Sequence, residues 1–414
     1  MENLNINRER LQADIEALAA IGRGDDYGIY RMAFSDGDIQ GRKWFIKKAE
    51  EAGLDFYQDG AANLHARYLW DEQKPSVVMG SHIDTVPAAG HLDGALGVVV
   101  ALECLRCIKE QGLKVNYPLE AIAFSDEEGR FGGMLGSQAI AGMLTPEKIV
   151  NASDLDGVSL IDAMQNIGLD AMNALHAKRN PESILAFLEL HIEQGPMLDN
   201  MGISIGNVDA IAGLFKWDIT LTGTANHAGT TPMDMRKDAF MGLSAFASQL
   251  QRILDENGSP RSVATIGRVE ISPGAANVIP GKVEFSLDAR DTNPEVLNDL
   301  ANAFRKSLSA IARKYELMFD FRVLSEIAPV KSDAGIVETI ENVCKSLKVP
   351  FLQMASGAAH DTQIMANITR AGMIFVPSKD GRSHSIAEWT DMDDIERGAN
   401  VALNTLYRIA GGQL

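Results

Sequence analysis

The stretch GSHIDTVPAAGHLDGALG, residues 80–97, directly follows the apolar run VVM at residues 77–79. A buried strand usually ends in a turn that avoids titratable groups, but this one would end in His82 and Asp84, with Asp93 nine residues further on. The segment is therefore either an ordinary polar turn or a metal site at the end of a strand. The sequence on both sides of it favours the metal site.

The length and composition exclude some classes of partner. The chain has 414 residues, of which 46% are hydrophobic, a composition typical of a globular protein with two or three domains. Its formal net charge of −18 argues against nucleic acid or an anionic membrane surface as a partner, because phosphate binding needs clustered Lys and Arg. A small anionic ligand remains compatible with this charge, since local charge can oppose net charge.

Neither a membrane anchor nor an export signal is expected. The segment at residues 1–22 is polar and charged and lacks the apolar core of a secretory signal. No uncharged apolar run reaches the roughly 18 residues of a transmembrane helix. Cys104 and Cys107 lie inside a predicted helix without a second cysteine pair, so core packing is favoured over redox or zinc chemistry. We therefore expect a protein of the reducing cytoplasm.

Short apolar strands alternate with helices in the outer parts of the chain. Such alternation predicts an α/β sheet that is mostly parallel. The four clearest strands are predicted at residues 76–80, 119–124, 185–190 and 374–376. The middle of the chain follows a different order, strand, helix, two strands, helix and strand, which is the ferredoxin-like arrangement. The strands are predicted at residues 215–222, 263–271, 283–288 and 318–324 and the first helix at residues 238–254, and Asn293 is predicted to cap the second helix, with Pro294 as its first residue. We therefore predict one α/β domain at residues 1–211 and 327–414, interrupted by a small α+β domain at residues 212–326.

Each of the four strands is followed by His or carboxylate residues. The segments are SHID at 81–84, SDEEG at 125–129, HIEQG at 191–195 and, slightly further on, GRSH at 381–384. Because ligands bind beyond the carboxyl ends of parallel strands, we expect these side chains to meet at one edge of the sheet. A single His there would be read as a structural residue, as we expect for His65, but four such segments together indicate a common site.

Three His and two carboxylates form a nitrogen and oxygen ligand set that suits zinc, and also manganese, cobalt or nickel. Five ligands are more than a single catalytic zinc normally takes, so two metals sharing one carboxylate fit better. Asp93 is the natural bridge, because its glycine-rich loop can fold back over the strand ends. Asp84 would orient the imidazole of His82. In the pair Glu127-Glu128, one carboxylate would bind metal and its neighbour would act as general base.

Several motifs together resemble one family. GSHIDTVP, HLDGALG, FSDEEG, ELHIEQG, NHAGTTPM and SHS resemble the di-metal amidohydrolases that cleave N-carbamoyl-L-amino acids, allantoate and ureidoglycolate, within the aminoacylase and carboxypeptidase-like superfamily. The resemblance covers nearly the whole chain, with the motifs in the same order. It implies a di-zinc exopeptidase-like catalytic domain with two divalent ions per subunit. It also implies that the inserted domain serves as a lid and joins two subunits into a homodimer.

The resemblance also implies a role for each residue. His82, Asp93 and His191 would bind one ion, and Asp93, Glu128 and His384 the other. Glu127 would be the general base. The remaining roles are a contact of Gln194 with the ureido group, stabilisation of the oxyanion by His227, and binding of the substrate carboxylate by Asn277 and Arg290.

Two of the side chains keep a second interpretation. Arg290 offers the two-pronged clamp that a carboxylate needs, but it could equally form a salt bridge with Asp288 or Asp291. His360 lies either near the substrate or in a structural position.

The expected reaction is hydrolysis of an N-carbamoyl-L-amino acid to the L-amino acid, ammonia and carbon dioxide. Carbamoyl amino acids are favoured because the segment at residues 372–390 resembles the family members that hydrolyse them. Allantoate or ureidoglycolate is the alternative substrate, because the ligand set does not distinguish these compounds. A di-zinc peptidase or deacylase is less favoured, since His191 with Gln194 resembles the ureido branch. A metal-binding scaffold without catalysis is disfavoured because the base Glu127 is present.

Overall fold

The computed structural model describes residues 3–413, and the chain divides into two compact units. The first unit comprises the chain up to Asp209, Ser332–Met354 and the chain from His360 onward. The second unit comprises Ala210–Lys331 and Ala355–Ala359. Each unit has its own hydrophobic core, as two independent folding regions would. That residues 212–326 serve as lid and dimerisation domain stays a prediction.

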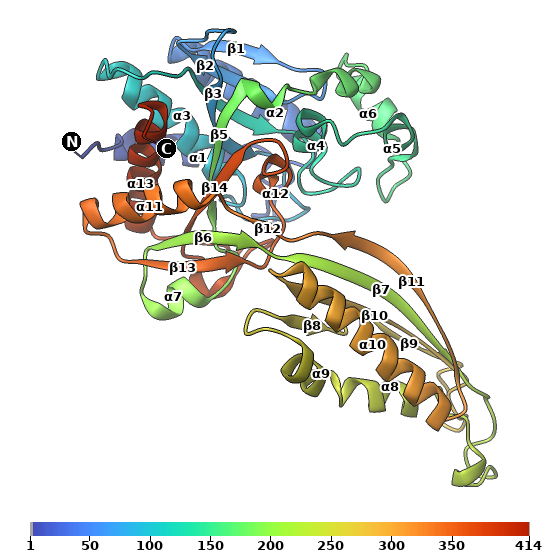
Figure 1. The fold of residues 1–414 in the computed structure, drawn as a ribbon. Coiled ribbons are helices and arrows are strands. Elements are labelled where there is room, and N and C mark those ends of the chain that lie inside the picture. The colour runs from blue at the N-terminus through green and yellow to red at the C-terminus, as the bar shows by residue number, and fades with distance from the viewer. Residues whose placement is uncertain (1–2, 414) are drawn as a thin grey trace. The chain divides into compact units, whose positions relative to one another are not determined.

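A mixed sheet with the strand order β1-β2-β4-β3-β5-β14-β6-β12 organises the first unit, although β12 itself belongs to the second, and β13 pairs with β6 (Figure 1). The strands are β1 (Asp55–Gln58), β2 (Leu64–Tyr68), β3 (Ser76–His82), β4 (Leu119–Phe124), β5 (Ile184–Ile192), β6 (Ile205–Ile211), β12 (Val330–Lys331), β13 (Phe351–Ser356) and β14 (Arg370–Val376). β4, β3, β5 and β14 are the predicted strands, and every residue of β3 and β4 is buried.

The prediction of a mostly parallel sheet is right for the centre and wrong for the flanks. β3 runs parallel to β4 and β5, and β14 runs parallel to β5. The outer pairs β1-β2, β2-β4, β14-β6 and β12-β6 are antiparallel. β1 and β12 are short and partly exposed, so they lack the continuous apolar run that reveals a central strand. The sheet is therefore mixed, with a parallel centre.

The helix α3 (Ala95–Glu110) ties the centre of the sheet to the surrounding helices. Its residues 95–108 are all buried, and it packs against β3 and β4 and against α1 (Arg8–Ala19) and α13 (Met392–Ala410). Cys104 and Cys107 are buried on it and form no disulfide, as the prediction of core packing requires. Because α3 begins directly after Gly94, the loop that carries Asp93 is fixed to a rigid element at its end.

The remaining helices of the first unit surround this core or cover the far strands. They are α2 (Asp36–Glu51), α4 (Leu135–Ala141), α5 (Pro146–Asn151), α6 (Leu160–Asn166), α7 (Met197–Met201), α11 (Ala334–Leu347) and α12 (Asp361–Met365), with short 3₁₀ turns at Ala171–Ala177, Pro181–Ser183 and Lys379–Gly381. None of the helices within residues 3–413 combines the length and apolar character that crossing a membrane requires.

The second unit is an antiparallel sheet covered by helices. Its strand order is β11-β7-β10-β8, with β9 also paired to β10. The elements are β7 (Gly213–Thr222), a 3₁₀ turn (Met233–Met235), α8 (Ala239–Ala247), α9 (Leu250–Asn257), β8 (Val263–Thr265), β9 (Val269–Ser272), β10 (Lys282–Asp291), α10 (Pro294–Lys314) and β11 (Met318–Ile327). Burial alternates along β7 and β10, because one face of the sheet packs against the helices.

Two predicted elements of this unit are divided. The predicted helix at residues 238–254 is two helices, α8 and α9, separated at Ser248 and Gln249. The predicted strand at 263–271 is two strands, β8 and β9, which pair with opposite ends of β10. By contrast, Asn293 caps α10 through a hydrogen bond from the Glu295 N–H, and Pro294 is the first helical residue, as predicted.

Candidate metal centre

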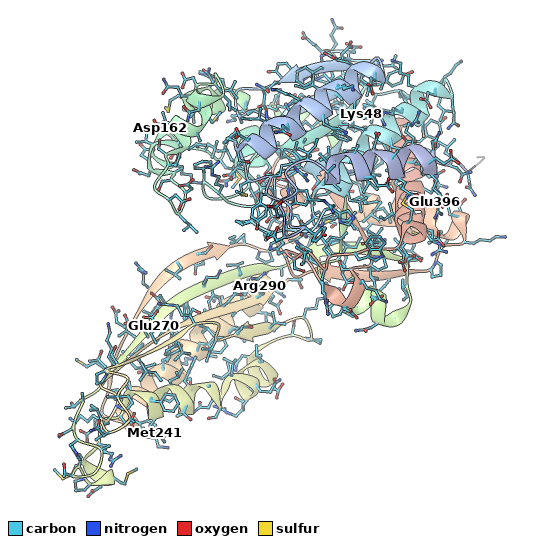
Figure 2. All side chains as sticks on the ribbon, turned by 180° about the vertical axis from the view of Figure 1, so that it is seen from behind. Lys48, Asp162, Met241, Glu270, Arg290 and Glu396 are labelled. Carbon is cyan, nitrogen blue, oxygen red and sulfur yellow. The ribbon has the colours of Figure 1, made fainter. Side chains whose placement is uncertain are left out.

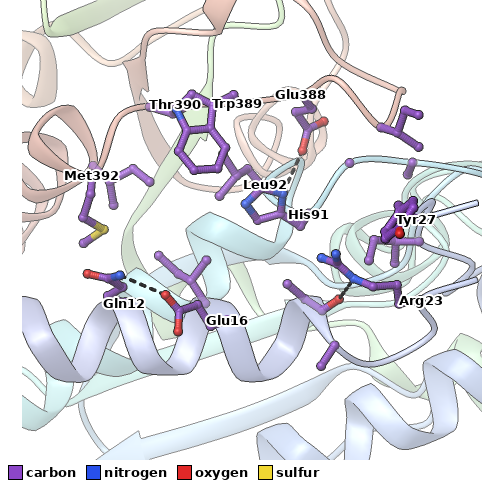
Figure 3. A pocket seen from close by; sticks show the side chains of 18 residues that line it. Gln12, Glu16, Arg23, Tyr27, His91, Leu92, Glu388, Trp389, Thr390 and Met392 are labelled. Carbon is purple, nitrogen blue, oxygen red and sulfur yellow. Dashed lines mark hydrogen bonds between the residues drawn. The ribbon is translucent and has the colours of Figure 1, made fainter.

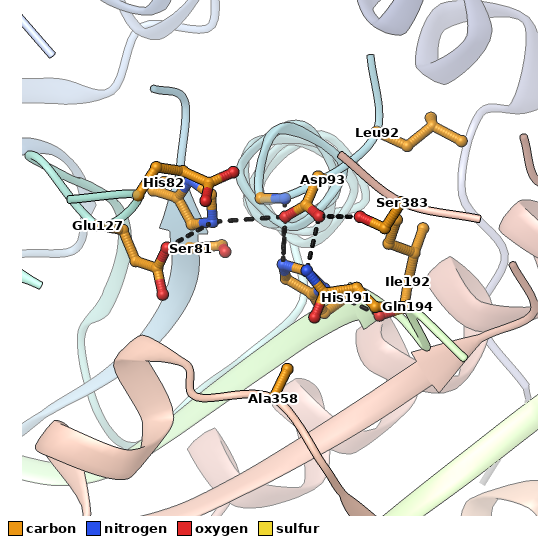
Figure 4. A network of polar contacts seen from close by, with 12 residues as sticks. Ser81, His82, Leu92, Asp93, Glu127, His191, Ile192, Gln194, Ala358 and Ser383 are labelled. Carbon is orange, nitrogen blue, oxygen red and sulfur yellow. Dashed lines mark hydrogen bonds and ion pairs between the residues drawn. The ribbon is translucent and has the colours of Figure 1, made fainter. Parts of the chain in front are cut away.

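The carboxyl ends of β3 and β5 and the loops after β3, β4 and β14 bring His and carboxylate side chains together. Three groups of such side chains have ligand atoms within 4.8 Å of one another, and two of these groups contain Asp93. These two groups are His82, Asp93 and His191, and Asp93, Glu128 and His384. Figure 4 shows Asp93 between the side chains of His82 and His191. The carboxyl ends of the parallel strands therefore deliver these side chains to one place.

In the first group both imidazoles face the same carboxylate oxygen. The Nε2 atoms of His82 and His191 lie 3.8 and 3.2 Å from Asp93 Oδ1. All three side chains are almost completely buried. The other nitrogen of each ring is engaged, because His82 Nδ1 lies 3.0 Å from the Asp84 carbonyl and His191 Nδ1 lies 2.9 Å from the Ile192 carbonyl. These contacts fix the rings and direct both Nε2 atoms toward Asp93.

The second group uses the other oxygen of Asp93. His384 Nε2 lies 3.5 Å from Asp93 Oδ2 and 3.4 Å from Glu128 Oε2. Glu128 Oε1 is buried and has no hydrogen-bond partner among the described residues. A buried carboxylate oxygen without a partner is costly unless a ligand or metal satisfies it. The two oxygens of Asp93 thus serve two separate groups, which is the arrangement of a bridging carboxylate.

The Asp84 carboxylate holds the backbone of the neighbouring loop. It accepts hydrogen bonds from the N–H groups of Glu127 and Glu128, at 3.3 and 3.1 Å. Its Oδ1 is 3.8 Å from His82 Nδ1, further than its own backbone carbonyl. The carbonyl of Asp84, and not the predicted carboxylate, is thus the closer partner of the imidazole. The carboxylate links the loop after β3 to the loop after β4.

Electrostatics inside the cluster favour a bound cation. Burial raises the pKa of Glu127 and of Glu128 well above the usual value, and nearby carboxylates raise both further. Burial lowers the pKa of His82 to about 4. Burial also acts to lower the pKa of His191, but Asp93 outweighs it and raises the value to about 9. Within residues 3–413, no Lys or Arg forms an ion pair with Asp93, Glu127 or Glu128, and a divalent ion relieves such an excess of buried negative charge.

Glu127 lies beside the first group without belonging to it. Its Oε2 is 3.5 Å from His82 Nε2, and its side chain is almost fully buried. The adjacent Glu128 belongs to the second group. The geometry is therefore compatible with the two roles predicted for this pair. Glu128 belongs to a group of potential metal ligands, and Glu127 lies next to the other group.

Strained backbone conformations gather around the cluster. The residues other than glycine that have positive φ in these loops include Ala88 (55°), Asp126 (50°), Gln194 (57°) and His384 (53°). A side chain normally disfavours this region, and such conformations concentrate where a site over-determines the backbone. Gly94 also has positive φ, and a Cβ there would overlap the ring of His82. Glycine is therefore required at this position, because the ring of His82, a proposed metal ligand, lies too close for a side chain.

Three residues hold the Asp93 side chain or its backbone. Gln194 Nε2 donates to Asp93 Oδ2 at 2.6 Å, and Ser383 Oγ donates to the same oxygen. Glu388 accepts hydrogen bonds from the Leu92 and Asp93 N–H groups. Gln194 was expected at the site, and its Oε1 is buried without a partner among the described residues. Ser383 and Glu388 were not expected, although Ser383 belongs to the SHS motif that drew attention to His384 and Glu388 follows that motif.

His360 is a buried neighbour of the cluster. Its ring packs edge-on against His191, with 4.6 Å between ring centroids. It also forms a third group of potential ligands with Glu189 and His191. Burial lowers the pKa of His360 well below the usual value. The residue thus touches the metal cluster from the side of β5.

The other expected site residues lie in the second unit. The loop of His227 pairs with that of Asn277, whose carbonyl accepts a hydrogen bond from the Ala228 N–H at 2.9 Å. Arg290, labelled in Figure 2, donates through Nε and Nη2 to the two oxygens of Asp288, at 2.9 and 3.1 Å. Its Nη1 donates to the Gly357 carbonyl at 2.7 Å. The salt bridge considered for Arg290 is therefore present, with Asp288 and not with Asp291.

The residues present fit a pair of divalent ions. The cluster supplies imidazole nitrogens and carboxylate oxygens, a mixed set that suits zinc and manganese. Its ring orientations are fixed by backbone carbonyls, and one of its carboxylate oxygens has no partner.

Known proteins resemble this chain over most of their length. The chain matches peptidase family M20/M25/M40 over residues 78–408. It is 38% identical to an N-carbamoyl-L-amino acid amidohydrolase of Geobacillus stearothermophilus, over 99% of this chain and 100% of that protein. It is 35% identical to an allantoate amidohydrolase of Escherichia coli, over 97% of this chain and 98% of that protein.

Other relatives extend the comparison. A ureidoglycolate hydrolase of Arabidopsis thaliana is 32% identical over 99% of this chain and 88% of that protein. The crystal structure of an amidase of the hydantoinase/carbamoylase family from Burkholderia multivorans superposes with a TM-score of 0.92 at 33% identity, over 98% of both chains. The family resemblance seen in the sequence motifs is confirmed, and the chain belongs to peptidase family M20/M25/M40.

Proposed function

We propose that the protein is a metal-dependent amidohydrolase of linear ureido compounds, with an N-carbamoyl-L-amino acid as the substrate. The products are the L-amino acid, ammonia and carbon dioxide. The observation that carries the proposal is the pair of ligand groups that share Asp93, next to the separate carboxylate of Glu127. The relatives named as amidohydrolases of ureido compounds support the substrate class.

Two divalent ions fit the two groups, with zinc favoured and manganese, cobalt or nickel compatible. His82, Asp93 and His191 would hold one ion, and Asp93, Glu128 and His384 the other. When bound, such a pair activates water at neutral pH and acts as a Lewis acid toward the carbamoyl oxygen.

Glu127 moves the proton in this proposal. Its carboxylate accepts a proton from the attacking water and returns it to the nitrogen that leaves. Its raised pKa suits this exchange, because a base that is too weak would not hold the proton between the two steps. The cause of that raised pKa is first burial and then the neighbouring carboxylates, among them Asp361 and Glu128.

The substrate contacts are assigned to polar side chains in both units. Gln194 Nε2 is already bonded to Asp93, so its unpartnered Oε1 is the atom available to the ureido N–H groups. Asn277 and Arg290 would bind the carboxylate, and His227 would stabilise the oxyanion. Arg290 must share or exchange its bond to Asp288 to do so. We further infer a cytoplasmic homodimer built through the second unit, in which His227 serves the partner's site.

Allantoate and ureidoglycolate are the second candidate substrates. They offer the same ureido group and a carboxylate, and relatives named for them are 35% and 32% identical to this chain. The metal groups and Glu127 would act on them in the same way. The choice among substrates therefore depends on the part of the ligand beyond the ureido group.

The test is ammonia release by the metal-reconstituted protein. N-carbamoyl-L-methionine, N-carbamoyl-β-alanine, allantoate and ureidoglycolate are compared at equal concentration. A preference for the carbamoyl α-amino acid supports the proposal, and a preference for allantoate or ureidoglycolate moves it to the second candidate. Ammonia release from none of the four would overturn the ureido assignment.

A further inference from the structure

Glu388 is a buried carboxylate that the reaction above does not use. The residue is 2% exposed, and it comes from the loop between β14 and α13. Its Oε1 accepts hydrogen bonds from the Leu92 N–H at 2.6 Å and the Asp93 N–H at 3.1 Å. Figure 3 shows Glu388 directly beside Leu92. One oxygen therefore binds two successive N–H groups, the second of which belongs to Asp93 itself.

The loop that carries Asp93 depends on this contact. At one end, Ala89 is bridged to Ile29, and at the other end α3 begins after Gly94. Residues 90–93 between these points belong to no helix or strand. Backbone N–H groups that are buried outside regular structure need an acceptor, and Glu388 provides it for two of them.

A cavity next to the loop increases the dependence of the loop conformation on its hydrogen bonds to Glu388. The cavity has a volume of about 680 Å³, and Gly90, His91, Leu92 and Glu388 are among the residues that line it (Figure 3). Close packing therefore does not hold the loop on that side, because part of the neighbouring space is open. Gly90 packs tightly against Glu388, and any Cβ at that position would overlap the carboxylate. The fit between loop and carboxylate is thus close.

We propose that Glu388 is a positioning residue of the metal centre. By fixing the backbone of Leu92 and Asp93, it keeps one oxygen of Asp93 directed at His82 and His191 and the other directed at His384. The inference rests on the proposed function only in taking these groups to be metal sites. It assigns the effect to hydrogen-bond acceptance and not to charge, since a single oxygen accepts both N–H groups.

This assignment makes opposite predictions for two variants. Glu388→Gln retains a carbonyl oxygen for both N–H groups, and its amide would face Ser383 Oγ, which lies 3.4 Å from Glu388 Oε2 and can accept. Glu388→Ala leaves both N–H groups without their acceptor. Because Asp93 belongs to both groups, we expect Glu388→Ala to weaken binding of both ions together, by about 10–100-fold, while Glu388→Gln binds nearly as the unsubstituted protein does.

Metal affinity is measured by titrating the metal-free protein with Zn²⁺ and with Mn²⁺ in competition with a chelator. Gly90→Ala is a second route to the same defect, because it displaces Glu388 without changing its chemistry. Asp333→Ala is the matched control. One oxygen of Asp333 likewise accepts two backbone N–H groups, from Gly335 and Ile336, at the start of α11. We expect it to lower stability and leave metal affinity unchanged.

A readout on the metal-free protein separates this inference from the proposed function. Amide hydrogen exchange of the segment at residues 90–95 should be faster in Glu388→Ala and Gly90→Ala, and unchanged in Glu388→Gln. This holds even if the ammonia assay fails. Unchanged exchange and metal affinity in a folded Glu388→Ala variant would overturn the inference, as would Glu388→Gln behaving like Glu388→Ala. Gly90→Ala keeps the test open if Glu388→Ala does not fold.

Discussion

The first unit contains two buried clusters of His and carboxylate side chains, and they differ in how their charges are balanced. One is the metal cluster of His82, Asp93, Glu128, His191 and His384 with the adjacent Glu127. The other, which we call the His65 cluster, consists of Asp59, His65, Arg67, Glu120 and Arg179. Both are built from residues on or next to the same sheet. The His and carboxylate residues alone do not tell the two clusters apart.

The His65 cluster is satisfied internally. Glu120 binds His65 Nδ1 at 2.7 Å, Arg67 at 3.2 Å and Arg179 at 2.6 Å, and it accepts from Ser76 Oγ at 3.1 Å. Burial acts to raise the pKa of Glu120, but Arg179 and the other partners outweigh it and hold the pKa well below the usual value. Asp59 faces the opposite ring nitrogen of His65, at 3.4 Å. The two carboxylates therefore do not converge on one point where an ion could bind.

The metal cluster has the opposite balance. Among residues 3–413, no Lys or Arg forms an ion pair with Asp93, Glu127 or Glu128. The imidazoles converge on one carboxylate, and one oxygen of Glu128 is unsatisfied. A structural network of buried carboxylates thus contains its own cations, whereas a metal site leaves the positive charge to be supplied by the ion.

Removing metal should produce the largest effect and should distinguish the two clusters. We expect chelation, or the substitution Asp93→Ala, to reduce ureido hydrolysis to background, because Asp93 belongs to both ligand groups. Readdition of zinc or manganese should restore the chelated protein but not the variant. Metal content and ammonia release are measured on the same samples. Full activity of a sample shown to be metal-free would show that hydrolysis does not depend on metal at the Asp93 cluster.

Replacing the base should separate chemistry from metal binding. We expect Glu127→Gln to retain both ions and the fold while turnover falls by about 10²–10⁴-fold, the usual contribution of a general base. The amide keeps the shape of the side chain but cannot take a proton. Steady-state kinetics with metal analysis tests this, and near-normal turnover would remove Glu127 from the mechanism.

Breaking the His65 cluster should affect stability without affecting metal. Arg179→Met leaves Glu120 with too few cations in a buried position. Removing one partner of a buried ion pair typically costs about 3–5 kcal/mol in the free energy of unfolding. Urea unfolding measures this loss, and metal analysis is the control. A loss of bound metal at unchanged stability would show that the two clusters have been assigned the wrong way round.

The smallest effect is a pH dependence of stability. The pKa of His65 is raised above 6.5 because Asp59 and Glu120 outweigh the effect of burial. The stability that the charged ring provides is therefore complete below about pH 6.5 and is lost as pH rises through the higher folded-state pKa. Urea unfolding between about pH 6 and pH 9 should show this decline in the unsubstituted protein and a weaker decline in His65→Asn. An equal slope in both would exclude His65 as its source.

Much of the site was predictable because strand ends are visible in sequence. The apolar runs of β3, β4, β5 and β14 could be recognised, and the residues that follow them meet because those strands are parallel. Their ring orientations were not predictable. The partner of His82 Nδ1 is the Asp84 carbonyl, and a backbone atom leaves no mark in a residue pattern.

Other features depend on contacts between distant segments. Glu388 binds N–H groups 296 and 295 residues earlier in the chain, so neither spacing nor periodicity could reveal it. The antiparallel flanks of the sheet escaped prediction because β1 and β12 are short and partly exposed. The break between α8 and α9 escaped because the sequence there stays compatible with a continuous helix.

Crystals of the zinc-loaded protein, measured on both sides of the zinc absorption edge, would show whether two ions share Asp93. We expect two anomalous peaks about 3.5–4 Å apart. One should lie at His82 and His191, the other at Glu128 and His384, with Asp93 between them, and no peak should lie at the His65 cluster. A single peak, an empty metal cluster, or zinc at His65 would be incompatible with a two-ion site that shares Asp93.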